Sequence, residues 1–200
     1  SKEVAELSAR LFKNNKTVLI DGYWQSPLYF GSYQDQIKKD FFFKNKIEET
    51  KEANIQELLE TIRTTNSVMI NIRRTDYLNN NFHGVFGMEY IKQASMVLEE
   101  KTANRNLNYF VFSDDISWCK ENIKLKNVTF VDHTYAGNKF EYYLQLMIKC
   151  KHFIIPNSSF AWWAAWLNDD KNKVVVAPKK WFNDLNLNTT DLIPSNWIRI

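Results

Sequence analysis

The stretch "SVMINIRRTDY" (residues 67–77) joins an apolar run to two adjacent arginines. Residues 67–72 predict a β-strand, because a short apolar run is typical of a strand that is covered on both faces. Arg73 and Arg74 follow where this strand ends, and a polar loop comes next. In an open α/β sheet, ligands bind at the carboxyl ends of the strands, so the arginine pair predicts a site for an anion.

The same alternation of strand and helix continues along the rest of the chain. The pattern predicts strands at residues 67–72, 108–113, 128–132, 152–156 and 173–178, and helices at 54–65, 87–101, 114–123, 138–150 and 158–168. Asn54 and Glu57 have the spacing of a capping box, which predicts Asn54 as the N-cap of its helix. Together these elements predict an α/β fold with a Rossmann-like parallel sheet flanked by helices.

The first part of the chain has a less regular pattern. It predicts a helix at residues 2–13, a strand at 16–20, a helix start at Ser26-Pro27, a helix within 33–44 and a solvated, charged linker at 44–52. We therefore expect two parts, residues 1–53 and a Rossmann-like domain at residues 54–200.

The composition excludes several classes of protein. The 200 residues are 44% hydrophobic with a net charge of +3, which argues against a disordered chain and against a nucleic-acid binder. No apolar run reaches the roughly 18 residues of a membrane span, so no transmembrane segment is expected. The two cysteines do not make a disulfide framework, and they favour a reducing compartment.

Polar residues gather just after the predicted strands. They are Arg73, Arg74 and Asp76 after the first strand, Asp114 and Asp115 after the second, and Asn157, Ser158 and Ser159 after the fourth. A helix that begins near Ser158 would direct its N–H groups and its positive dipole end toward the same edge of the sheet. An arginine fork there matches phosphate oxygens, so a phosphorylated small molecule such as a nucleotide is the expected ligand.

Each of these residues also has a purely structural interpretation. One arginine can pair with Asp76 or with another nearby acid. Ser158 can be a plain N-cap, and Asp114 can cap the helix that follows it. The placement of all three groups at successive strand ends favours a binding site over these separate explanations.

Several segments of the chain together resemble the alpha-1,2-fucosyltransferases of glycosyltransferase family 11. They are "NIRRTDY", "YFVFSDDISWCKENI", "NSSFAWWAAWL", "VVVAPKKWF" and "DLIPSNWIRI", with "GYWQSPLYF" nearer the start. The match runs from about Gly22 to the end and corresponds to the family's donor-binding, carboxyl-terminal portion. The glycine-rich segment that opens family members is absent, so residues 1–53 are expected to come from the acceptor-side lobe or a linker.

The resemblance implies an activity as well as a fold. It implies a GT-B architecture, GDP-fucose as donor, and inverting transfer of fucose to the 2-hydroxyl of a terminal galactose on a glycan. It also implies no cofactor and no metal, and the sequence has no D-x-D triplet. The expected partners are thus a nucleotide sugar and a galactose-terminated glycan. A cytoplasmic location is expected; attachment at the membrane periphery and the oligomeric state are left open.

The family motifs assign roles to individual residues. By resemblance, Arg73 contacts the β-phosphate of the donor, and the residues that bind GDP-fucose are Asn71, Arg73, Arg74, Asp114, Asp115, Asn157, Ser158, Ser159 and Phe160. Asn71 stands where the family has histidine, and asparagine cannot carry a charge. The contacts that this histidine would make with the donor are therefore not carried over.

The predicted catalytic residues are Arg73 and Asp76. Arg73 would stabilise the charge that develops on the β-phosphate. Asp76 is the first candidate for the general base, with an ion pair to an arginine as its alternative role. Tyr23, Trp24 and His83 are expected to contact the acceptor.

Three functions are compatible with the sequence. The first is a GDP-fucose-dependent glycosyltransferase, and the second is a catalytically silent or truncated module that still binds a GDP-sugar. The third is a carbohydrate-binding or interaction domain in which the arginine pair is structural. Nucleotide binding separates the third function from the first two, and turnover separates the first from the second.

Overall fold

The computed structural model describes residues 19, 21, 25–30, 33–184 and 186–200. The predicted helix at 2–13, the predicted strand at 16–20 except Leu19, and the acceptor candidates Tyr23 and Trp24 lie outside these residues. The chain divides into two compact units. The larger unit holds Phe43–Leu187 and Trp197–Ile200, and the smaller holds Ser1–Phe42 and Asn188–Asn196.

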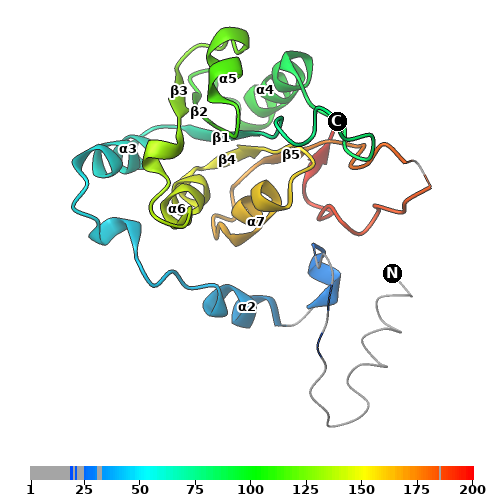
Figure 1. Cartoon of the computed structure of the whole chain (residues 1–200), viewed down its shortest axis with the longest axis horizontal. Coiled ribbons are helices and arrows are strands. Elements are labelled where there is room, and N and C mark those ends of the chain that lie inside the picture. Colours follow the sequence, from blue (N-terminus) through cyan, green and yellow to red (C-terminus); the bar gives the residue numbers. More distant parts are fainter. Residues whose placement is uncertain (1–18, 20, 22–24, 31–32, 185) are drawn as a thin grey trace. The chain divides into compact units, whose positions relative to one another are not determined.

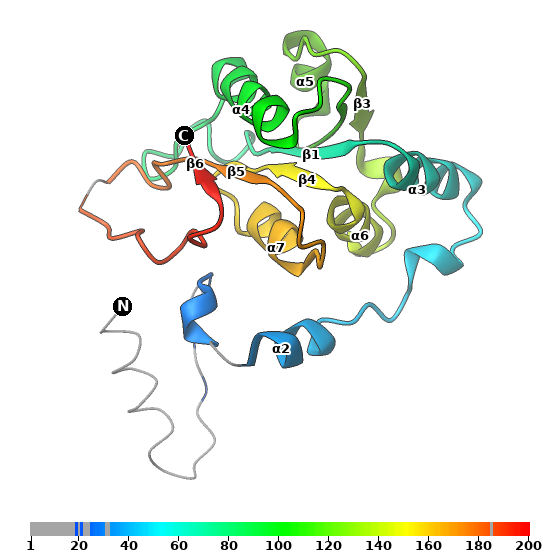
Figure 2. The ribbon, with the colours of Figure 1, turned by 180° about the vertical axis from the view of Figure 1, so that it is seen from behind.

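The described residues form a sheet of six parallel strands in the order β3-β2-β1-β4-β5-β6, which confirms the predicted Rossmann-like architecture. The strands are β1 (Ser67–Ile72), β2 (Asn108–Ser113), β3 (Val128–Val131), β4 (His152–Ile154), β5 (Val175–Ala177) and β6 (Ile198–Arg199). The short strand β6, which no pattern predicted, pairs with β5 at the edge of the sheet (Figure 2).

Helices cover both faces of the sheet in the larger unit (Figure 1). Helices α4 (Met88–Thr102) and α5 (Ile116–Asn122) lie on one face, and α3 (Ala53–Thr64), α6 (Glu141–Lys149) and α7 (Ser159–Leu167) lie on the other. This two-sided cover explains why β1 and β2 are buried along nearly their whole length. In β1, Val68 and Ile70 join the buried core beneath α4 and α5, and the intervening Met69 is also fully buried.

The charged segment before α3 is largely exposed, as predicted, but it is anchored at one residue. It contains a 3₁₀ helix, η3 (Ile47–Glu49), and Ile47 is fully buried. The buried amide of Gln145 fixes this segment, because it accepts from the Ile47 N–H at 3.0 Å and donates to the Asn45 carbonyl at 2.8 Å. This segment lies within the larger compact unit, which begins at Phe43; the division at residue 54 stays a prediction.

The predicted cap of α3 was also wrong. The helix begins at Ala53 with Glu52 at its N-cap position, and no side chain caps it. Asn54 consequently lies inside the first turn. Gln56, one turn into the helix, donates instead to the carbonyls of η3, including that of Ile47 at 2.9 Å.

Other boundaries differ from the prediction by a few residues. The predicted helices at 114, 138 and 158 begin at Ile116, Glu141 and Ser159, and the strand predicted at 173–178 spans only Val175–Ala177. In the smaller unit, the Ser26 side chain accepts from Leu28 N–H and caps a 3₁₀ helix, η1 (Pro27–Tyr29), as the Ser-Pro pair predicted. The predicted helix within residues 33–44 is α2 (Gln34–Asp40).

One buried tyrosine ties the carboxyl ends of two strands to α6. The Tyr143 hydroxyl accepts from the Ser113 N–H at 2.9 Å and donates to the Val131 carbonyl at 2.8 Å. Ser113 ends β2 and Val131 ends β3. Tyr143 therefore fixes the sheet edge at which the predicted site residues lie.

Removing this hydroxyl is expected to destabilise the protein. Tyr143→Phe leaves two buried backbone groups unpaired, which costs about 1–3 kcal/mol of unfolding free energy. Urea unfolding measures this loss. Tyr142→Phe is the matched control, because Tyr142 precedes it in α6 and is only half-buried. An equal effect of the two substitutions would contradict the role given to Tyr143.

Candidate functional site

The predicted site residues follow neighbouring strands of the sheet, near the point between β1 and β4 where the strand order reverses. The helix after β1, α4, covers one face of the sheet, and the helix after the neighbouring strand β4, α7, covers the other. Such a topological switch point opens a crevice at the carboxyl ends of the two strands. One hydrogen bond, from the Tyr77 hydroxyl to the Asn157 carbonyl at 3.2 Å, connects the loops that follow β1 and β4.

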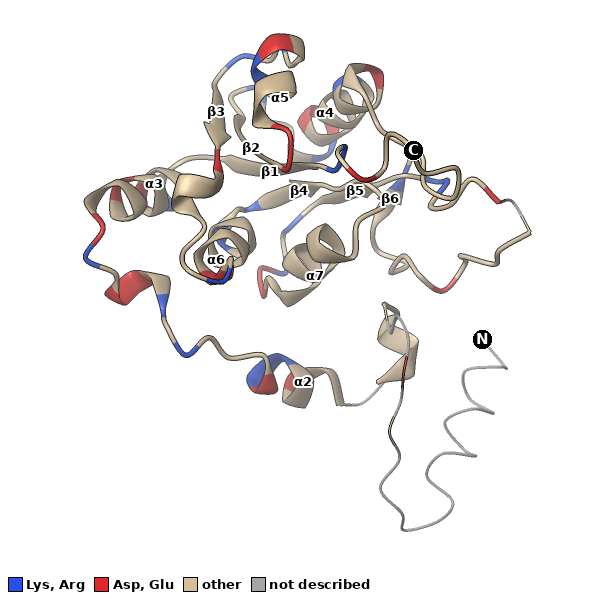
Figure 3. Cartoon of the chain, in the orientation of Figure 1, with Lys and Arg blue, Asp and Glu red and all other residues tan. Residues whose placement is uncertain are grey.

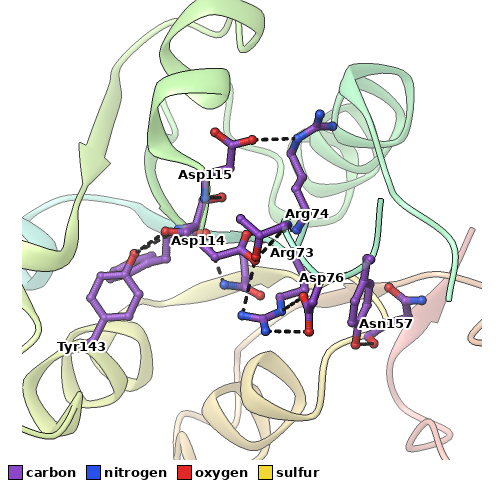
Figure 4. Close-up of polar contacts among 12 residues, drawn as sticks. Arg73, Arg74, Asp76, Asp114, Asp115, Tyr143 and Asn157 are labelled. Carbon is purple, nitrogen blue, oxygen red and sulfur yellow. Dashed lines mark hydrogen bonds and ion pairs between the residues drawn. The ribbon is translucent and has the colours of Figure 1, made fainter. Parts of the chain in front are cut away.

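Arg73 is the more exposed of the two arginines, and two carboxylates hold it (Figure 4). Its Nε and Nη2 lie 2.8 Å from the two oxygens of Asp76, and its Nη1 lies 3.3 Å from Asp114. These three contacts leave two of the five guanidinium N–H donors for another acceptor. The Arg73 side chain is 40% exposed, so it is accessible to a ligand from solvent.

Arg74 has a structural environment. Its guanidinium carbon lies 3.8 Å from the centroid of the Trp118 ring, and its Nε lies 3.3 Å from Asp115. Its side chain is only 14% exposed. The structure thus gives an acidic partner to both arginines, where a structural pairing was expected for one of them.

Asp114 holds the loop after β1 instead of capping α5. Its Oδ1 accepts from the Arg74 N–H at 3.0 Å, and its Oδ2 accepts from the N–H and the hydroxyl of Thr75 at 3.1 and 2.5 Å. The cap of α5 is Asp115, which accepts from the Trp118 N–H at 3.1 Å. The interpretation of Asp114 as a helix cap was therefore wrong.

The charges at this edge do not sum to a positive patch. The carboxylates of Asp76, Asp114 and Asp115 outnumber the two arginines that they contact. Figure 3 shows the acidic segment that leads into α5 close to the basic end of β1. An anion bound here would depend on the remaining donors of Arg73 and on the N–H groups of α7 rather than on net charge.

The N-terminal turn of α7 supplies such N–H groups. Helix α7 begins at Ser159, and the first N–H groups of an α-helix have no partner within the helix. Ser158 occupies the N-cap position and is buried, but its side chain makes no capping hydrogen bond. Phe160 is 37% exposed on the first turn.

Asn157 lies buried beneath this turn. Its Nδ2 donates to the Trp181 carbonyl at 2.9 Å, while its Oδ1 is buried and has no hydrogen-bond partner. A buried acceptor of this kind favours a donor such as a hydroxyl group. Asn71 is half-buried, as the two arginines are, and its Nδ2 donates to the Phe112 carbonyl of β2 at 3.2 Å.

Asp76 forms an ion pair with Arg73. This pairing was the predicted alternative to a role as general base. The hydrogen bond from Arg73 holds the pKa of Asp76 below its ordinary value of 3.8, against the opposing effect of partial burial. A carboxylate with a lowered pKa is a weak base. Its catalytic role stays a prediction.

The stability that the Arg73–Asp76 ion pair contributes should fall at acid pH. Because the pKa of Asp76 is lowered in the folded state, the ion pair contributes to the free energy of unfolding above pH 3.8. This contribution is lost as the pH falls through the lowered pKa. A carbon-13 NMR titration of the Asp76 carboxyl should give a midpoint below 3.8. The midpoint should return toward 3.8 in Arg73→Ala, and an unchanged midpoint would contradict the pairing.

His83 contributes an imidazole to the neighbouring loop. Its ring stacks on Tyr77 with the centroids 4.3 Å apart and the planes 6° apart. Burial lowers the pKa of His83, and the negative charge of Asp76 partly opposes this shift. The sequence predicted a role for His83 but not for Thr75, Tyr77, Trp118 or Tyr143. Thr75 and Tyr77 had a signal in their place within the quoted "NIRRTDY" motif, and Trp118 in its place within "YFVFSDDISWCKENI", whereas Tyr143 had none.

The described part of the chain offers neither a cluster of metal ligands nor a membrane-spanning helix. There, no three His, Cys, Asp or Glu side chains are grouped so that they could hold a metal ion. None of the described helices is both long enough and apolar enough to cross a bilayer. Independence from metal remains a prediction.

Comparison with known proteins identifies the family. Residues 6–200 match the family model described as glycosyl transferase family 11. The chain is 38% identical over 191 residues to an Alpha-1,2-colitosyltransferase of Escherichia coli, which covers 90% of this chain and 61% of that protein. It is 34% identical to the O-antigen biosynthesis glycosyltransferase WbnK of the same species over 68% of this chain and 45% of that protein.

A more distant relative is the Galactoside alpha-(1,2)-fucosyltransferase 1 of Mus musculus, with 28% identity over 74% of this chain and 41% of that protein. The chain therefore spans about 40 to 60% of the length of these relatives. The family model matches residues 6–200 of this chain, which include the whole sheet and the switch point. The chain belongs to glycosyltransferase family 11.

Proposed function

We propose that this chain binds the donor of an inverting, metal-independent alpha-1,2-glycosyltransferase that transfers fucose from GDP-fucose to the 2-hydroxyl of a terminal galactose. The observation that carries the proposal is the position of Arg73 directly after β1 in a family 11 sheet, next to β4, which leads into α7. At such a switch point, the arginine and the first N–H groups of α7 would act on one ligand. A pyrophosphate is the part of a nucleotide sugar that such donors recognise.

The proposed reaction breaks the bond between the anomeric carbon and the β-phosphate oxygen. The acceptor 2-hydroxyl oxygen forms the new bond from the opposite face, and GDP leaves with the electron pair. Negative charge therefore grows on the β-phosphate, where Arg73 and the N–H groups of Ser159 and Phe160 would stabilise it. Asn71, Asn157 and the Ser158 and Ser159 side chains complete the proposed donor site.

The acceptor hydroxyl must lose its proton in this step. Asp76 is the proposed base, although its ion pair with Arg73 makes it weak. A weak base suffices when the proton leaves late, because the hydroxyl becomes strongly acidic once its oxygen has bonded to carbon. Binding of phosphate to Arg73 would also loosen the ion pair and make Asp76 more basic.

A second candidate donor is GDP-colitose, because the chain is 38% identical to an alpha-1,2-colitosyltransferase. Colitose and fucose are both 6-deoxy sugars, and the donors of Arg73 and α7 described above concern the pyrophosphate that both nucleotide sugars share. The two candidates share the nucleotide, the linkage and the metal-independent chemistry. They differ only in the hydroxyl at carbon 3 of the sugar.

Turnover with the two donors tests the proposal. The chain is incubated in EDTA with lactose and either GDP-fucose or GDP-colitose, and mass spectrometry detects the trisaccharide. A product from either donor supports the proposed transferase activity, and the donor that reacts faster identifies the sugar that is transferred. GDP-fucose binding without any product would instead show a module that binds the donor but does not transfer it. Absence of both binding and product would leave the carbohydrate-binding alternative.

A further inference from the structure

Four aromatic rings contact one another in a cluster built from the loop after β1 and the segment after β5. The rings belong to Tyr77, Phe82, His83 and Phe182, and together they are called the aromatic wall. Phe82 and Phe182 have centroids 4.6 Å apart, and His83 lies 5.0 Å from Phe82 and 5.7 Å from Phe182. Tyr77 stacks on His83 from the side of the candidate site.

Backbone hydrogen bonds fix the aromatic wall in place. Asn183 donates through its N–H to the Phe82 carbonyl at 2.9 Å and through its Nδ2 to the carbonyls of Asn81 and His83, both at 3.0 Å. The Asn80 side chain accepts from the Phe82 N–H at 2.8 Å. Two loops that are about a hundred residues apart in sequence are thereby held together.

The aromatic wall is not covered by the core. Phe82 is 45% exposed, although the loop around it is ordered by at least four hydrogen bonds. A single exposed phenylalanine is common and needs no explanation. A row of contacting rings on a loop that hydrogen bonds already hold in place is different. Because this loop is ordered before a ligand binds, less conformational entropy is lost on binding.

The aromatic wall continues directly from the candidate site. The guanidinium carbon of Arg73 lies 5.9 Å from the centroid of the Tyr77 ring. Tyr77 also bonds to the Asn157 carbonyl, immediately before α7. A group attached to a phosphate held by Arg73 would therefore lie within a few ångströms of the aromatic wall.

We propose that the aromatic wall binds the apolar face of a hexopyranose ring, a role that rests on the proposed function. One face of such a ring presents C–H groups, which pack favourably on aromatic surfaces, and its hydroxyl groups point outward to solvent and polar residues. Two sugars have this chemistry here: the 6-deoxyhexose of the donor and the galactose of the acceptor. His83, which was expected to contact the acceptor, supplies one ring of the surface.

Saturation-transfer-difference NMR on the whole chain tests this proposal. Aromatic protons are irradiated selectively in the presence of methyl α-L-fucoside or methyl β-galactoside. We expect transfer to the ring protons of at least one glycoside, reduced more than twofold by Phe82→Ala and by Phe182→Ala. Leu78→Ala is the matched control, because Leu78 is 53% exposed in the same loop but is no part of the ring cluster.

The two glycosides separate the possible sources of the sugar. Transfer to the fucoside assigns the aromatic wall to the donor, and transfer to the galactoside assigns it to the acceptor. Absence of transfer to both, or equal transfer in wild type and Phe82→Ala with unchanged protein spectra, would overturn the proposal. A parallel titration with GDP distinguishes the cases. Failure of GDP to bind argues against the proposed function, whereas bound GDP without sugar contact argues against the aromatic wall alone.

Discussion

Replacing Arg73 with alanine is expected to lower the affinity of the chain for GDP by about 100-fold. Loss of one charged partner of a phosphate typically costs several kcal/mol of binding free energy, and about 1.4 kcal/mol corresponds to a factor of ten. The substitution also leaves Asp76 and Asp114 without the cation that they contact, so their charges would repel the phosphate. Isothermal titration calorimetry in EDTA measures the change.

Arg63→Ala is the matched control for this measurement. The Arg63 side chain is 41% exposed, nearly the same as that of Arg73, and it also makes an ion pair, with Glu48 at 2.7 Å. It lies on α3 and is no part of the candidate site. We expect GDP affinity to be unchanged in Arg63→Ala. Equal affinities for wild type, Arg63→Ala and Arg73→Ala would show that Arg73 is a structural residue.

The Asp114→Ala variant is expected to lose both stability and GDP affinity. Asp114 accepts from two backbone N–H groups and one hydroxyl of the loop after β1, and it contacts Arg73. Its side chain is only 13% exposed. Removal of a largely buried, charged acceptor with several donors should cost about 3 kcal/mol of unfolding free energy. The loop that positions Arg73 would lose its shape at the same time.

Asp115→Ala is the comparison for this second variant. Asp115 is the neighbouring carboxylate, and it caps α5 and pairs with Arg74. Loss of a cap costs about 1 kcal/mol, so Asp115→Ala should unfold at a higher urea concentration than Asp114→Ala. The GDP affinity of Asp115→Ala should fall much less. The opposite order of the two variants would contradict the role given to Asp114.

The sheet could be predicted from the sequence because its signals are local. Runs such as residues 67–72 and 108–113 are mostly apolar on both faces, which is the direct consequence of helices on both sides of the sheet. The strand ends then placed Arg73, Asp114 and Ser159 at one edge without any knowledge of the contacts. Strand β6 was missed because two residues carry no periodicity.

The contacts within the site could not be predicted, since they depend on residues far apart in sequence. Asp114 and Asp115 are adjacent acids before a helix, and the sequence alone does not decide which one caps it. The choice follows from the register of β1 and β2, which places Asp114 beside the N–H groups of Arg74 and Thr75. Ile47 was missed for a similar reason, because its burial depends on Gln145 nearly a hundred residues away.

A GDP titration followed by proton–nitrogen NMR in EDTA tests the central claim most directly, because it locates the ligand as well as detecting it. The account predicts that the largest shifts occur at the backbone amides of Thr75, Ser159 and Phe160, on the two sides of the switch point between β1 and β4. The signal of the Arg63 backbone amide, on α3, should not shift. A folded chain whose spectrum does not change, or changes only away from these two loops, would contradict the assignment of this edge of the sheet as the nucleotide-sugar site.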